Sequence, residues 1–184
     1  MFIGKLDFRP VLLNEDLVPK SVFDFVLNWQ GSVSKDTFCV SQIDPQYAGG
    51  VELCNQYNIP EEIGANCLII EAKRAQQVWY AACLVPVGYR YNMTSVVRKA
   101  LNARTVSVAP LDMVIEKTGM EYGSITAIGL PEEWTIFVDP LVMENERIII
   151  GGGYVNSKLS ILTEVFREMP NAVILDGVAK KIED

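Results

Sequence analysis

The chain of 184 residues contains no histidine and few cysteines. Histidine is the commonest metal ligand and the side chain best suited to proton transfer near neutral pH, so its absence excludes Ser-His and Cys-His hydrolysis and argues against a zinc site. The four cysteines are widely spaced, form no C-x-x-C pair and have apolar neighbours: Cys39, Cys54, Cys67 and Cys83. We therefore expect buried free thiols.

Long apolar runs and an excess of positive charge are also missing. No run approaches the roughly eighteen apolar residues of a membrane span, and the opening MFIGKLDFRP carries charges where a signal peptide needs its apolar stretch. We expect a cytoplasmic protein without a membrane partner. The net charge of −7 argues against extended binding along a nucleic-acid backbone. It leaves room for a small basic patch facing one RNA end, or for ordinary solvent-facing basic residues: Lys73, Arg74, Arg90, Arg98, Lys99 and Arg104.

The composition is that of a folded domain with a real core. Hydrophobic residues make up 49% of the chain and charged residues 21%, which is too apolar for a disordered protein. We find no repeat, linker or low-complexity segment. The chain is therefore expected to form one domain over residues 1–184.

Apolar spacing and turn residues predict helices and strands in a mixed order. Helices are expected at 21–30, from an Asp44 cap to about 57, at 94–101 with Thr94 as cap, from 110 to Gly119, and at 163–169. Strands are expected at 37–43, 65–72, 77–87, 105–109, 135–138, 147–150, 158–162 and 172–175. Short turns between several neighbouring strands demand antiparallel pairing, which favours an α+β fold with a mixed sheet over a doubly wound parallel fold.

One stretch, GMEYGSITAIGLPEEW at 119–134, places three glycines and a proline among small hydroxyl side chains. Glycine permits positive φ angles and close backbone approach. The stretch therefore fits either a tight connecting loop or a backbone cradle around a ligand. Composition alone favours the loop.

Three segments in fixed order carry a family resemblance: VVRKALNARTVSVAPLDMVIEKTGMEYGSITAIGLP, then IFVDPLVMENERIIIGGG, then AVILDGVAKKI. Through them the chain resembles the YbaK/prolyl-tRNA synthetase-associated domain family, the free-standing and inserted aminoacyl-tRNA editing domains. The resemblance runs from about Ser21 to Ile182 and is strongest from Val96 to Gly153. It implies a single compact α+β domain whose mixed, largely antiparallel, barrel-like sheet is surrounded by helices.

The resemblance also implies an activity and a site. The activity is hydrolysis of an amino acid wrongly attached to tRNA, with neither a metal nor an organic cofactor. The glycine loop would place backbone groups around the ester, with Gly123 as its key position and Asn66 facing it. Residues expected to line the substrate site are Ser124, Ile125, Thr126, Ala127, Gly152 and Gly153, and those expected to contact tRNA are Arg98 and Lys99.

Two positions depart from the family pattern. The family loop has the form G-x-x-x-P, and its proline position here holds Ala127. Without the restriction that proline places on φ, the loop should be less rigid unless packing by Ile125 and Ile128 compensates. The family lysine at the start of the hairpin corresponds to Asn66, an amide without positive charge. Lys158, after a glycine break, either restores that charge in the substrate site or is an exposed strand lysine.

The sequence thus indicates a free-standing trans-editing deacylase acting on the acceptor end of a mischarged aminoacyl-tRNA. The departures at Asn66 and Ala127 support an alternative, a non-catalytic module that binds an aminoacyl or nucleotide-like ligand or an aminoacyl-tRNA synthetase. A third reading is hydrolysis of another small aminoacyl ester, which needs no tRNA-binding surface and suits the acidic chain.

Overall fold

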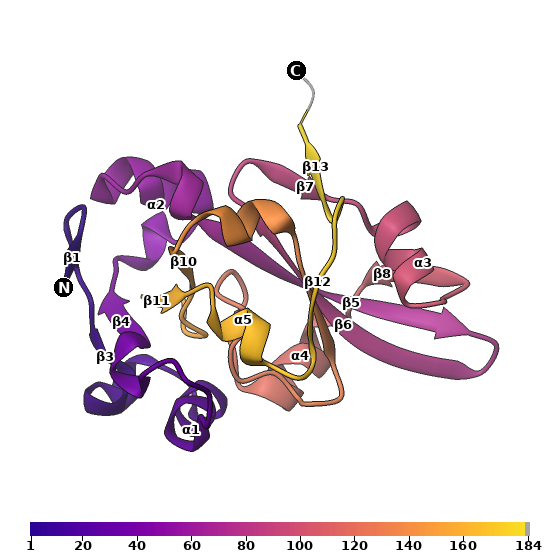
Figure 1. Ribbon diagram of the computed structural model, residues 1–184, viewed down its shortest axis with the longest axis horizontal. Coiled ribbons are helices and arrows are strands. Elements are labelled where there is room, and N and C mark those ends of the chain that lie inside the picture. Colours follow the sequence, from indigo (N-terminus) through magenta and orange to yellow (C-terminus); the bar gives the residue numbers. More distant parts are fainter. Residues whose placement is uncertain (183–184) are drawn as a thin grey trace.

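The hairpin expected near residues 65–87 is the centre of the larger sheet (Figure 1). Strands β5 (Ala65–Arg74) and β6 (Gln77–Pro86) pair antiparallel over their full length. This computed structural model describes residues 1–182. The order of strands in the larger sheet is β12-β9-β6-β5-β8. Its other strands are β8 (Thr105–Val108), β9 (Thr135–Val138) and β12 (Ala172–Ile174). Because β9 runs parallel to both β6 and β12, the sheet is mixed, as predicted.

A second sheet, entirely antiparallel, has the order β10-β11-β4-β3. Its strands are β3 (Arg9–Pro10), β4 (Cys39–Gln42), β10 (Arg147–Gly151) and β11 (Ser157–Leu162). A single parallel bridge between Gly64 and Ile149 joins the beginning of β5 to β10. Among the described strands the curved arrangement is thus two sheets in contact at one corner, and not one closed barrel.

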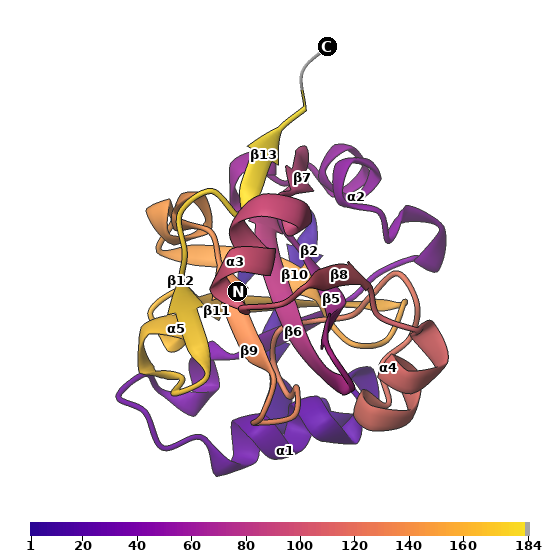
Figure 2. The same ribbon diagram turned by 90° about the vertical axis from the view of Figure 1, so that its right-hand side faces the viewer.

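Helices lie around the two sheets (Figure 2). They are α1 (Lys20–Asn28), α2 (Gly50–Tyr57), the single turn α3 (Arg98–Ala100), α4 (Leu111–Thr118) and α5 (Val165–Glu168). The apolar stripe of α1 explains its place, since Val22 and Val26 are fully buried in the core that both sheets share. Within residues 1–182 no helix has the length and apolar character needed to cross a bilayer.

Three predicted helices differ in the structure. The Asp44 carboxylate does accept the Gln46 N–H as a cap, but this turn ends at Tyr47, and the extended Gly49 separates it from α2. Glycine has a low helix propensity, which explains the break. Thr94 is not a cap: it lies inside a π-helical turn, Met93–Val97, that runs into α3. The helix predicted from Thr163 shortens to α5.

Five short strands were not predicted: β3, described above, and four more at the ends of the fold. β1 (Phe2–Ile3) pairs with β2 (Leu6–Asp7), and β13 (Ala179–Lys181) pairs with β7 (Tyr89–Tyr91). Strands of two or three residues show no measurable alternation of apolar and polar side chains, so periodicity could not reveal them.

The thiol prediction is confirmed. All four cysteines are free, and the side chains of Cys39, Cys54 and Cys83 are buried while that of Cys67 is partly so. Burial raises the pKa of each thiol, that of Cys83 to about 12. They therefore remain protonated packing groups near neutral pH.

Candidate active site

The glycine loop begins where α4 ends. Gly119 adopts a left-handed conformation with φ of 69° and terminates the helix, as predicted. Four residues on, Gly123 is exposed and has φ of 83°, and a Cβ atom there would meet no other atom within 4 Å. Backbone conformation, not crowding, therefore requires glycine at position 123.

The loop is fastened to the segment after β10 by four hydrogen bonds. The Gly153 N–H donates to the Ser124 carbonyl at 2.8 Å, and the Glu121 N–H donates to the Gly153 carbonyl at 2.7 Å. The Gly152 N–H donates to Ser124 Oγ at 3.2 Å, and the Val155 N–H to Glu121 Oε2 at 2.7 Å. These contacts restrain the loop without the family proline.

Gly151 and the buried end of the loop add to this restraint. A Cβ atom on Gly151 would lie 2.5 Å from the Ser124 carbonyl oxygen and 2.8 Å from that of Ile125, so the two segments touch through their backbones. Ala127 and Ile128 are fully buried, and Ile125 is partly so. The side chain at position 127 thus fills the core.

Several backbone N–H groups of the loop have no acceptor inside the described part of the chain, including those of Tyr122, Gly123, Ile125, Ala127 and Ile128. Thr126 differs, because it is fully buried and its N–H points to the sulfur of Met120 at 3.5 Å. Its hydroxyl, expected from the sequence to meet a ligand, therefore faces the interior and has no partner in residues 1–182.

Asn66 lies one residue into β5, beside the junction of the two sheets. The bridge pairs Gly64 with Ile149 in parallel. Asn66 and Gly151 each lie two residues beyond a bridge residue in the same direction, so they lie near one another. Asn66 is exposed, and a Cβ atom on Gly50 would lie 3.3 Å from its Oδ1 atom. The amide therefore lies against the first residue of α2.

Lys158 is buried, so the expectation of an exposed strand lysine is wrong. Only 6% of its surface is exposed, and its ammonium donates to the Ala48 carbonyl at 2.8 Å. It is also the register partner of Gly151 in β10. No carboxylate in residues 1–182 forms an ion pair with it. Desolvation lowers the pKa of Lys158 to about 8, which still leaves it mostly charged at neutral pH.

Several predicted site residues are thus brought together around one short strand end. Gly151 touches the glycine loop, pairs with Lys158 and lies near Asn66. Lys158 and Asn66 both contact the segment 48–50 that leads into α2. Sequence reasoning did not assign this segment or Glu121 to the site. The Gly49-Gly50 pair could have indicated that this segment belongs to the site. No feature of the sequence indicates the same for Glu121.

Arg98 and Lys99 are not part of this group. Both lie in α3, beside the tip of the β5–β6 hairpin, whereas Asn66 lies at the opposite end of β5 (Figure 1). The seven residue steps from Asn66 to Lys73 span roughly 23 Å at a strand rise of about 3.3 Å per residue. A molecule bound at the glycine loop must extend along much of the hairpin to reach that end of it.

Solved structures share this fold. The hypothetical protein APE2540 superposes with a TM-score of 0.67 at 21% identity, covering 78% of this chain and 92% of that one. A candidate trans-editing enzyme for prolyl-tRNA synthetase superposes with a TM-score of 0.67 at 12% identity, covering 86% and 98%. A scaffold protein for epitope backbone grafting by computational design gives 0.62 at 12% identity, covering 76% and 86%. At such identities the likeness establishes the fold alone.

No curated protein matches the chain significantly. A family model does: the aminoacyl-tRNA editing domain matches residues 44–169, from the Asp44 turn to the end of α5. That range holds the glycine loop, Asn66, Gly151 and Lys158, and it confirms the resemblance seen in the sequence. The chain belongs to the aminoacyl-tRNA editing domain family.

Proposed function

We propose that this protein is a free-standing deacylase that hydrolyses the ester linking a wrongly attached amino acid to tRNA, and that residues 1–184 act as one domain. The observation that carries the proposal is the family match over 44–169, a range that contains the fastened glycine loop with its unused N–H donors. The acceptor end of the tRNA would bind between this loop and the segment 48–50.

In the proposed reaction, water attacks the ester carbonyl carbon, and the bond between that carbon and the ribose oxygen breaks. The products are the free amino acid and a tRNA whose terminal ribose hydroxyl has taken a proton. The Gly123 and Ile125 N–H groups would stabilise the oxyanion that forms on attack; one such preorganised donor is worth about 3 to 4 kcal/mol of barrier. This chemistry requires neither histidine nor a metal.

Asn66 and Lys158 would together replace the family lysine, Asn66 by hydrogen bonding and Lys158 by its positive charge. The Asn66 amide can donate and accept, so it suits a ribose hydroxyl or the amino group of the substrate. The Lys158 ammonium, held in a poorly solvated place under Ala48, would supply positive charge to the same region. Gly152, Gly153 and the backbone of Ser124 to Ala127 would form the wall between them. Arg98 and Lys99 would contact tRNA beyond its terminal adenosine.

A second candidate function is a binding module that has the same pocket without hydrolysis. The observation in its favour is that the Lys158 ammonium already donates to a carbonyl and is almost entirely buried. Asn66 then offers no charge to replace it. Such a module would bind an aminoacyl or nucleotide-like ligand, or a synthetase.

The deciding experiment is a deacylation screen of the purified protein against a panel of mischarged tRNAs, with Gly123→Ala as the test variant. A side chain at position 123 has room but opposes the positive φ, so it should shift the donor and slow hydrolysis about 100-fold or more. Gly88→Ala is the matched control, because Gly88 has the same φ of 83° and equally open surroundings, in the turn after β6.

Hydrolysis that survives Gly123→Ala unchanged would contradict the role of the loop. Hydrolysis of no mischarged tRNA, together with measurable binding of tRNA or amino acid, would establish the binding module instead.

A further inference from the structure

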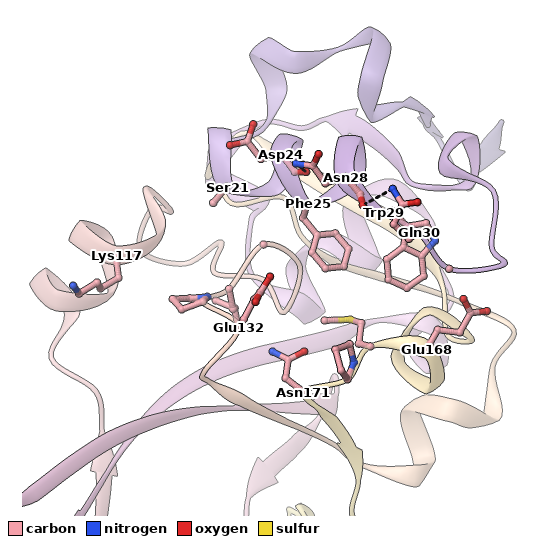
Figure 3. A pocket seen from close by; sticks show the side chains of 16 residues that line it. Ser21, Asp24, Phe25, Asn28, Trp29, Gln30, Lys117, Glu132, Glu168 and Asn171 are labelled. Atoms are coloured by element: carbon pink, nitrogen blue, oxygen red, sulfur yellow. Dashed lines mark hydrogen bonds between the residues drawn. The ribbon is translucent and has the colours of Figure 1, made fainter.

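A groove with a volume of about 1070 Å³ lies between α1 and the end of the glycine loop (Figure 3). One wall is the face of α1 from Ser21 to Asn28 and the chain that follows it to Gly31. The opposite wall is formed by residues 129–132 and by the turn 168–171 between α5 and β12. Lys117 of α4 stands at one end.

The groove is separate from the candidate active site. None of the residues proposed for catalysis, substrate or tRNA contact lines it. Gly129 marks the division, because its α-carbon lies against the Ser21 backbone: a Cβ atom there would be 2.5 Å from the Ser21 carbonyl oxygen. From this contact onward, residues 129–132 line the groove. A ligand of the groove therefore needs an explanation of its own.

The floor of the groove is apolar. Phe25 points into it, and its ring lies 5.5 Å from that of Trp29, between centroids. Leu130 and Met169 complete the floor. Aromatic and methionine side chains are enriched where proteins bind other proteins, because they bury much area and adapt their shape.

The rim is acidic. It carries the carboxylates of Asp24, Glu132 and Glu168, against the single cation of Lys117. Asp24 is paired with Lys20, but Glu168 accepts hydrogen bonds from the uncharged backbone N–H and hydroxyl of Ser32.

Glu132 is exposed and pairs with no cation in residues 1–182. Two rim carboxylates, those of Glu132 and Glu168, therefore lie above an apolar floor without a cationic partner in residues 1–182.

We propose that this groove binds a short peptide segment of a partner protein in which lysine or arginine alternates with large apolar side chains. Apolar side chains of the peptide would meet Phe25 and Met169, and its cations would meet Glu132 and Glu168. The groove is long enough, since the seven residue steps from Ser21 to Asn28 span roughly 10 Å of helix and the groove continues to Gly31. Three to five extended residues cover about that distance.

The peptide class follows from charge and shape together. A polyanion is repelled by the rim, and a purely apolar ligand leaves the two carboxylates without a cationic partner. A small organic cation would satisfy one carboxylate but would leave much of the length of the groove empty. Only an extended chain with repeated cations uses the floor and both carboxylates.

The test uses a fluorescein-labelled hexapeptide, Arg-Leu-Arg-Trp-Arg-Leu, titrated with the full-length protein and followed by fluorescence anisotropy. Glu132→Lys is the test variant and Glu133→Lys its matched control, because both side chains are exposed in the same loop but only Glu132 lines the groove. We expect Glu132→Lys to weaken binding roughly three- to tenfold, and Glu133→Lys to change it less than about twofold. Peptides with glutamate for arginine, or serine for leucine and tryptophan, should not bind.

Backbone amide shifts in an NMR titration locate the bound peptide, and should change along α1 and at 129–132 and 168–171. Equal weakening by the two variants, shifts confined to other surfaces, or binding of phenethylammonium as tight as that of the peptide would each overturn the proposal. The proposal does not depend on deacylation, so the screen described above can fail without affecting this result.

Discussion

Replacing Lys158 by methionine removes a positive charge that folding buries. The side chain is 6% exposed, and its ammonium has one carbonyl partner, that of Ala48 at 2.8 Å. Desolvation lowers the lysine pKa from 10.5 to about 8. Methionine has a similar length without the charge, so the variant isolates the cost of holding an ammonium in this place.

The sign of the pH effect follows from the lowered pKa. Below about pH 8 both the folded and unfolded chains hold the proton, and the folded state carries the whole desolvation cost. Above pH 8 the folded chain loses the proton first, so the unfolded chain binds more protons and the free energy of unfolding rises. The full shift from 10.5 to 8 corresponds to about 3 kcal/mol. Between about pH 7 and 9 the wild type should gain about 1 kcal/mol relative to Lys158→Met.

Urea unfolding of both proteins across this range measures the difference. Thiols and tyrosines with raised pKa values also affect stability, but they are common to both chains and cancel. Cys54 is an exception, because burial raises its pKa and the charge of Lys158 partly opposes that rise, so both proteins should also carry Cys54→Ala. A stability difference that stays constant from about pH 7 to 9 would refute the buried-charge reasoning.

The same titration separates two roles for Lys158 in the proposed reaction. If the ammonium stabilises the substrate or oxyanion, the deacylation that depends on Lys158 falls as the pH rises through about 8. A lysine acting as general base would give the opposite profile, because its neutral form would be the active one. We expect the fall, in the wild type and not in Lys158→Met.

Three further predictions concern the loop and the thiols. Gly151→Ala should lower the free energy of unfolding by about 1 to 3 kcal/mol and slow deacylation, because the new Cβ atom would lie 2.5 Å from the Ser124 carbonyl; unchanged urea unfolding would contradict that contact. Ser124→Ala should cost about 1 kcal/mol in the same assay, since the Gly152 N–H loses one acceptor. Cys83 should not react with a thiol reagent until the protein is unfolded, because it is fully buried and its pKa is raised to about 12; rapid labelling of the folded protein would show it to be accessible.

Local features of the fold could be predicted because short-range chemistry determines them. Strand β9 has the predicted bounds, Thr135–Val138, and α4 ends at Gly119 in the expected left-handed conformation. Asp139 caps the next turn by accepting the Leu141 N–H, the role expected of an acid before proline. Each of these depends on residues within a few positions of one another.

The site required contacts that no local pattern contains. Lys158 and Ala48 are 110 positions apart, and their hydrogen bond decides that the lysine is buried. The bridge from Gly64 to Ile149 likewise joins distant segments, and it determines which residues lie near Asn66. The apolar residues of 158–162 predicted a strand, but they could not show that Lys158 at its start is buried with them.

The long-range contacts explain how the fold could tolerate the two departures from the family pattern, at Ala127 and Asn66. Proline restrains a loop through its own ring, whereas here hydrogen bonds from Gly152 and Gly153 to Ser124 restrain the loop from a different strand pair. Under the proposed function, charge is relocated in a similar way, from the hairpin position now held by Asn66 to Lys158 in the second sheet. Both replacements depend on the same strand end, at Gly151, so a side chain there should disturb loop and charge together. If Gly151→Ala loses deacylation activity and no change of pH restores it, the cause is the displaced loop rather than the charge of Lys158.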